Sequence, residues 1–152
     1  MPTSSGEDVA WLSLPAKRES LDAFRHFVMT MAQSVPLASA VMSKIDLVLE
    51  EVLLNVMDYA YASGREGTMD VGCGLINDEF FQILVQDQGR PFNPLSQAAP
   101  DLTADIDHRL IGGLGVFLTK KMTDRLAYRY EHGRNILELG FRLQTAPAGN
   151  DA

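Results

Sequence analysis

Apolar residues recur at three- and four-residue spacing along residues 44–61, which is the pattern of a helix with one face in a core. Glu51 and Asn55 lie one turn apart on a neighbouring face of that helix. Burying a carboxylate or an amide without partners costs a few kcal/mol, so a group outside the helix should satisfy this pair. A ligand is one candidate. The alternative is that Asn55 bonds nearby backbone while Glu51 sits in water at the rim of the helix.

The same reading of apolar spacing predicts the other elements. Helices are expected over about 16–33, from near Pro36 to about 62, and over 113–123. Alternating or β-branched segments predict strands, with hairpin turns at 77–79 and 131–134. The expected strands are 9–14, 68–76, 80–85, 125–130 and 135–143.

Short turns between consecutive strands imply a mixed, mostly antiparallel sheet with the helices on one face. The predicted fold class is therefore α+β, a two-layer α/β sandwich. With 152 residues, of which 46% are hydrophobic, the chain can bury one substantial core. We expect a single domain over 9–143 between a disordered N-terminus, 1–8, and a disordered tail, 144–152.

The strand over 80–85 ends in an Asp-x-Gly-x-Pro turn formed by Asp87, Gly89 and Pro91. Gly89 would let the backbone approach a ligand closely, and Pro91 fixes the chain that leaves the turn. An ionised carboxylate only accepts hydrogen bonds, so Asp87 suits an exocyclic amine such as that of adenine. A plain structural turn is the alternative interpretation.

Residues 92–111 show no sustained periodicity, and loops of this length are typically functional lids or disordered segments. The helix that follows begins with Gly113, Leu114 and Gly115. Glycines that open a helix expose N–H groups beside the positive end of its dipole, which is a phosphate-binding arrangement. Arg109 lies just upstream and adds a cationic group.

Composition narrows the class of function. A net charge of −7 argues against a nucleic-acid partner, which usually requires clustered Lys and Arg. The single Cys73 lies in an apolar strand as an inert thiol, and the three histidines lack metal-ligand spacing, so a zinc site is not expected. No apolar run approaches the ~20 residues that span a bilayer, and the N-terminus lacks signal-peptide features. We expect a cytoplasmic protein with no membrane partner.

In order and spacing, Glu51-x-x-x-Asn55, the turn at 87–91, the irregular lid and the Gly-Gly-Leu-Gly helix start at 112–115 resemble the N, G1 and G2 boxes of the GHKL, or Bergerat-fold, ATPases. Within that superfamily the chain is similar to the bacterial anti-sigma-factor serine/threonine kinases, the RsbW-like group. The resemblance covers roughly residues 12–143.

The resemblance implies that Asn55 coordinates the Mg²⁺ that bridges the phosphates of ATP, and that Glu51 is the general base toward a substrate hydroxyl. It implies that Asp87 binds the adenine amino group. Gly89 would shape the adenine pocket, Gly113 and Gly115 would hold the lid hinge and phosphates, and Arg109 would contact the terminal phosphate. The complete set of expected nucleotide-binding residues is Asn55, Asp87, Gly89, Pro91, Arg109, Gly113, Leu114 and Gly115.

Two positions depart from the family pattern. Tyr59 stands where many relatives have His, and Glu138 stands where a Thr that contacts the adenine region is common. These departures concern details of the pocket rather than nucleotide binding itself.

The implied function is an anti-sigma factor that phosphorylates a STAS-type anti-anti-sigma protein, with the sigma factor as its other partner. The alternatives are a non-catalytic ATP-binding module that regulates a partner, and an ATP-hydrolysing module of a larger machine. The helix over 16–33 could supply a homodimer contact, although packing on the sheet explains its apolar stripe equally well.

Overall fold

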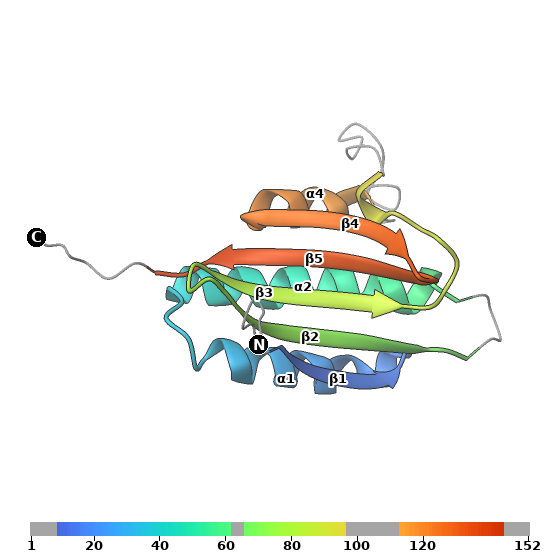
Figure 1. The fold of residues 1–152 in the computed structure, drawn as a ribbon, viewed down its shortest axis with the longest axis horizontal. Helices are drawn as coiled ribbons and strands as arrows, with labels where there is room; N and C mark the ends of the chain where they lie inside the picture. The colour runs from blue at the N-terminus through green and yellow to red at the C-terminus, as the bar shows by residue number, and fades with distance from the viewer. Residues whose placement is uncertain (1–8, 62–65, 97–112, 145–152) are drawn as a thin grey trace, which may run out of the picture.

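The computed structural model describes residues 9–61, 66–96 and 113–144. Five strands form one sheet in the order β1-β2-β3-β5-β4, and all four of its pairings are antiparallel (Figure 1). The strands are β1 (Ala10–Pro15), β2 (Thr68–Ile76), β3 (Phe80–Asp87), β4 (Arg125–Glu131) and β5 (Arg134–Arg142). The helices are α1 (Leu21–Ala32), α2 (Ser39–Tyr59) and α4 (Gly113–Met122), with 3-10 turns η2 (Arg18–Ser20) and η3 (Pro94–Ser96).

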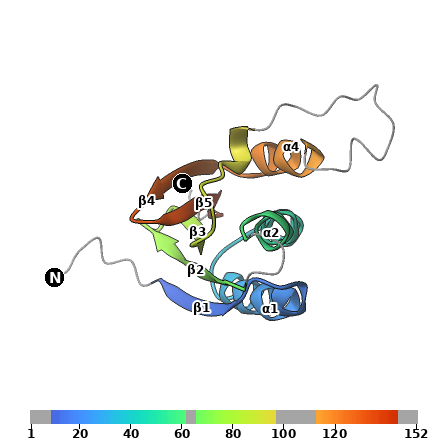
Figure 2. The same cartoon turned by 90° about the vertical axis from the view of Figure 1, so that its right-hand side faces the viewer.

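The three helices lie side by side on one face of the sheet, as the end-on view shows (Figure 2). This arrangement confirms the predicted α+β sandwich. The helices pack against apolar side chains on the inner face of the sheet. On β3 every second residue points toward the helices and is buried: Phe81, Ile83 and Val85. Asp87 is the next inward position of that strand, and it is also buried.

Helix α2 occupies the middle of the helical layer (Figure 2). The apolar stripe read from the sequence is the face that it buries: Ile45, Val48, Leu49, Val52 and Leu53. Helix α1 is attached to α2 by a two-bond ion pair between Arg25 and Asp46, with both N···O distances at 3.0 Å. The apolar residues of α1 also pack into the core, which accounts for the stripe without a second copy of the chain.

Two tight hairpins fix the register of the sheet. Asn77 and Asp78 both have positive φ, 53° and 58°, and connect β2 to β3. His132 and Gly133, with φ of 56° and 76°, connect the paired residues at the facing ends of β4 and β5. Two successive left-handed residues match the twist of antiparallel strands, and Asn, Asp and Gly tolerate that conformation best.

Several boundaries differ from the sequence prediction. The first helix begins at Leu21 rather than near residue 16, because the Ala16 N–H donates to the Gly67 carbonyl and continues the extended path of β1. Strand β3 is longer than predicted and includes Asp87. The segment predicted as a lid contains η3, and its residues 97–111 lie outside the described part of the chain, as do 1–8 and 145–152.

The contribution of the α2 stripe to stability can be tested with two leucines of the same helix. Leu49→Ala should lower the free energy of unfolding by about 2–5 kcal/mol, because the side chain is fully buried and its loss leaves a cavity. Leu47→Ala is the matched control, since Leu47 is 39% exposed and its truncation should change stability by less than about 0.5 kcal/mol. Chemical denaturation measures both; equal losses would contradict the packing described here.

Candidate functional site

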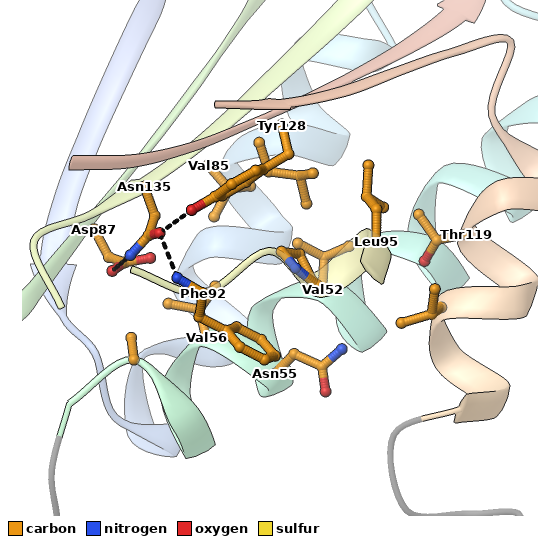
Figure 3. A pocket seen from close by; sticks show the side chains of 14 residues that line it. Val52, Asn55, Val56, Val85, Asp87, Phe92, Leu95, Thr119, Tyr128 and Asn135 are labelled. Atoms are coloured by element: carbon orange, nitrogen blue, oxygen red, sulfur yellow. Dashed lines mark hydrogen bonds between the residues drawn. The ribbon is translucent and has the colours of Figure 1, made fainter. Parts of the chain in front are cut away.

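A cavity of about 550 Å³, including its open mouth, lies between α2, α4 and the inner face of the sheet (Figure 3). Most of the lining is apolar, as is typical of small-molecule sites. The apolar lining residues are Val52, Val56, Ala60, Val85, Phe92, Pro94, Leu95, Val116 and Leu137. The polar lining residues are Asn55, Asp87, Thr119, Tyr128 and Asn135.

Asp87 is the charged residue of this lining, and it is only 5% exposed. Its Oδ1 accepts hydrogen bonds from the Gly89 N–H at 2.8 Å and from Asn135 Nδ2 at 2.9 Å. Burial raises the pKa of the carboxyl, and these two hydrogen bonds oppose that rise. No residue in the described part of the chain donates to Oδ2, so this oxygen is available to a ligand with an N–H group.

The turn after β3 is fixed by the end of α2. A Cβ at Gly89 would lie 2.0 Å from the Ala60 carbonyl oxygen, which also accepts a hydrogen bond from the Arg90 N–H at 3.1 Å. The Tyr61 hydroxyl accepts from the Gln88 N–H at 2.9 Å. These contacts hold Asp87 against the end of α2.

Gly89 was expected to let the backbone approach a ligand, but its close approach is to the backbone at the end of α2. Neither Gly89 nor the exposed Pro91 is among the residues that line the cavity. The next residue, Phe92, does line it, and its ring lies 6.3 Å from that of Tyr59 between centroids. The turn therefore presents Asp87 and Phe92 to the cavity, and the glycine serves the fold.

Glu51 and Asn55 stand one turn apart on α2, as the sequence predicted, and both are partly buried. Asn55 lines the cavity, with its amide directed away from Asp87 (Figure 3). Glu51 lies against the first turn of α4, where a Cβ at Gly115 would come within 2.5 Å of its Oε1. Burial, and secondarily the charge of Glu50, raises the pKa of the Glu51 carboxyl.

The other predicted phosphate-site residues are placed only in part. Helix α4 begins at Gly113, as the glycine-rich sequence indicated, and Gly115 is buried against Glu51. The side chain of Leu114 and the whole of Arg109 lie outside the described residues. The structure thus brings the start of α4 next to Glu51 but gives no position for Arg109.

The sequence did not indicate four cavity residues that carry hydrogen bonds: Phe92, Thr119, Tyr128 and Asn135. The signal for Asn135 was available, because it occupies the inward register of β5 with Leu137 and Leu139, where a polar residue needs partners. Its cross-strand partner is Asp87.

Glu138, by contrast, was aligned with an adenine-contacting position, and the structure shows that this was wrong. Its neighbours on β5, Leu137 and Leu139, point inward, so alternation places Glu138 on the outer face of the sheet. There its carboxylate pairs with Arg129, away from the cavity.

Within residues 9–61, 66–96 and 113–144, no cluster of three or more His, Cys, Asp or Glu side chains could hold a metal ion. The same residues contain no helix with the length and apolar character needed to cross a membrane.

A model of the histidine kinase-like ATPase domain matches residues 14–141 of the chain. The chain belongs to this family. Membership in this family implies that the chain binds ATP.

Curated relatives of this ATPase domain include proteins named serine-protein kinase RsbW. The chain is 29% identical to that of Halalkalibacterium halodurans over 80% of its own length and 76% of the relative's. The identity is 25% to that of Listeria monocytogenes, over 86% and 85%, and 28% to that of Staphylococcus epidermidis, over 87% and 86%.

Among solved structures, the RsbU and RsbW domains of a Mycobacterium tuberculosis protein match with a TM-score of 0.63 and 14% identity. The match covers 90% of this chain but only 32% of that chain. At this identity the likeness establishes the shared fold.

The contact of Gly89 with the end of α2 generates one prediction. Gly89→Ala should lower the free energy of unfolding by about 1–3 kcal/mol and weaken ATP binding, because the new methyl group collides with the Ala60 carbonyl and moves the turn. Gln88→Ala is the control, since it truncates an exposed side chain of the same turn and keeps the backbone N–H that bonds Tyr61. Denaturant unfolding and calorimetry measure both effects. Wild-type stability in Gly89→Ala would show that the contact is unimportant.

A second prediction follows from the raised pKa of Glu51. A carboxyl with a raised pKa in the folded state destabilises the fold when ionised, and this penalty disappears below its ordinary pKa, where both states are protonated. Glu51→Gln should therefore stabilise the protein near neutral pH, by less than about 1 kcal/mol because the group is partly solvated, and should have no effect near pH 4. Thermal unfolding across this range measures it.

Glu79→Gln is the control, because Glu79 is exposed at the β2–β3 hairpin and its substitution removes one negative charge from the surface. An equal pH-dependent gain in that variant would assign the effect to net charge instead of to the environment of Glu51.

Proposed function

We propose that the chain is an ATP-dependent protein serine/threonine kinase that acts in the cytoplasm as an anti-sigma factor. Its substrate would be a STAS-type anti-anti-sigma protein, phosphorylated on Ser or Thr, and its second partner a sigma factor. The observation that carries the proposal is the partly buried Glu51 carboxylate one turn from Asn55. A domain that only holds ATP needs a metal ligand at this helix but no base beside it.

The cavity supports ATP as the phosphoryl donor. Its apolar walls suit a purine ring, and Asp87 Oδ2, to which no described residue donates, would accept a hydrogen bond from the adenine amino group. Asn55 would provide the protein ligand of Mg²⁺, which commonly keeps few protein ligands and binds phosphates directly. The phosphates would lie toward the start of α4, at Gly113, Leu114 and Gly115, with Arg109 as the cationic contact. Bound Mg²⁺-ATP supplies the phosphoryl group.

Glu51 would take the proton of the substrate hydroxyl. Its raised pKa makes it a stronger base than an exposed glutamate, and base catalysis of this kind contributes roughly 10²–10⁴-fold. The absent side chain at Gly115 leaves the space that the carboxylate occupies. The relatives named serine-protein kinase RsbW support a protein hydroxyl as the acceptor.

The base role can be separated from ATP binding with matched glutamates of α2. In the presence of Mg²⁺, labelled ATP and a STAS-domain protein from the same genome, the wild type should transfer phosphate to Ser or Thr. Glu51→Gln should reduce transfer by roughly 10²–10⁴-fold while ATP affinity, measured by calorimetry, is retained. Glu50→Gln, which removes a neighbouring charge of the same helix, should keep most of the activity.

Undiminished transfer in Glu51→Gln would refute the assigned role. ATP binding with no phosphorylated partner would favour the non-catalytic regulatory module instead. Steady ATP turnover without a protein substrate would favour a hydrolytic module.

A further inference from the structure

The side-chain amide of Asn135 uses all of its hydrogen-bonding groups. Its Oδ1 accepts from the Phe92 N–H at 3.0 Å and from the Tyr128 hydroxyl. Its Nδ2 donates to Asp87 Oδ1 at 2.9 Å and to the Arg90 carbonyl at 2.8 Å. Because two donors surround the oxygen and two acceptors surround the nitrogen, only one orientation of this buried amide satisfies the site.

These partners come from separate parts of the chain. Tyr128 lies on β4 and Asp87 ends β3 (Figure 3). Arg90 and Phe92 belong to the segment that follows β3. Asn135 itself begins the inward register of β5, directly opposite Asp87. The amide therefore ties the turn and the two strands beside β5 into one arrangement at the inner end of the cavity.

This arrangement fixes the orientation of the Asp87 carboxylate. Asn135 Nδ2 and the Gly89 N–H both donate to Oδ1, so these bonds set the rotation of the carboxylate and leave Oδ2 for a ligand. We propose that Asn135, oriented by Tyr128, is a positioning residue that sets nucleobase selectivity by making Asp87 present an acceptor to the purine. This inference rests on the proposed ATP site and adds the residues that make it reject other bases.

The selectivity follows from the edge of the purine. Adenine carries an amino group at position 6, which can donate to Oδ2, whereas guanine carries an oxygen there that an acceptor repels. A site built around one buried hydrogen bond discriminates strongly against a ligand that cannot make it, since the buried oxygen then stays unpaired. If the carboxyl became protonated, it could donate to the guanine oxygen, and the preference would weaken.

Asn135 also affects the pKa of the Asp87 carboxyl. Burial raises the pKa of Asp87, and the bond from Asn135 is the leading influence that lowers it. The phenols of Tyr61 and Tyr128 face this carboxyl, but burial raises the pKa of each, so neither ionises near neutral pH. Of the other ionisable groups at this end of the described sheet, Asp70 and Arg134 lie on its outer face, and Glu131 and His132 lie at the β4–β5 turn. Tyr130, which is paired with Asn135 on β4, and Arg90, in the turn after β3, are both exposed.

Calorimetric titration of the full chain with Mg²⁺-ATP and Mg²⁺-GTP, between about pH 5 and pH 8, tests the inference. Asn135→Leu should reduce the ATP-to-GTP affinity ratio roughly tenfold or more, and its ATP affinity should decline with falling pH sooner than that of the wild type. Tyr128→Phe should shift both readouts in the same direction by less, because the Phe92 N–H still holds the amide. A change in packing alone would not alter the pH profile.

Asp87→Asn is a sharper test. The two donors at Oδ1 would hold the carbonyl oxygen of the introduced amide, which directs its NH₂ into the cavity. This variant should lose ATP affinity and shift the ATP-to-GTP ratio toward GTP. An equal loss of affinity for ATP and for GTP would contradict the proposed orientation of the Asp87 side chain.

Tyr130→Phe is the control, since it removes a phenol hydroxyl from an exposed residue of the same strand, and it should match the wild type. If Asn135→Leu does not fold, Tyr128→Phe and Asp87→Asn decide the question. An unchanged ratio and pH profile in the folded variants overturns the role of Asn135 but leaves the proposed kinase intact. A wild type that takes up neither ATP nor ADP with Mg²⁺ overturns the proposed function, and this inference with it.

Discussion

The hydrogen bond between Asp87 and Asn135 is the interaction on which the site depends. It joins neighbouring strands on the inward face of the sheet, where the adjoining positions are apolar. A buried carboxylate is tolerated only when its oxygens have partners, and here the fold supplies partners for Oδ1. No described residue donates to Oδ2, so a ligand can complete the hydrogen bonding of this carboxylate, which is typical of functional sites.

The rest of the architecture holds the elements around that pair in place. The contact of Gly89 with the Ala60 carbonyl fixes the turn after β3 to the end of α2. The same helix carries Asn55 and Glu51, so a single rigid element sets the distance between the buried Asp87 carboxylate and these two side chains. Helix α4 closes the far side of the cavity through Val116 and Thr119.

Sequence patterns predicted the fold class, the element order and most boundaries, because apolar periodicity records which face of each element is buried. They also placed Glu51 and Asn55 correctly on the central helix, whereas Asp87, predicted to follow its strand, is the last residue of β3. The predictions that failed depend on contacts between elements that are far apart in the sequence. Nothing local to Gly89 reveals that its neighbour is the end of α2, and choosing between Asn135 and Glu138 requires the register of β5 against β3. A shift of one residue exchanges the two faces of a strand, so alignment by motif could not decide it.

The strand order has a consequence for synthesis of the protein. Strand β5 follows the other described strands in the sequence, yet it lies between β3 and β4 in the sheet. Until the ribosome has released it, β3 has an open edge and Asp87 lacks the neighbour that holds its carboxylate. A nascent chain that lacks β5 therefore exposes an unpaired central strand, and the cavity can assemble only after β5 has joined the sheet.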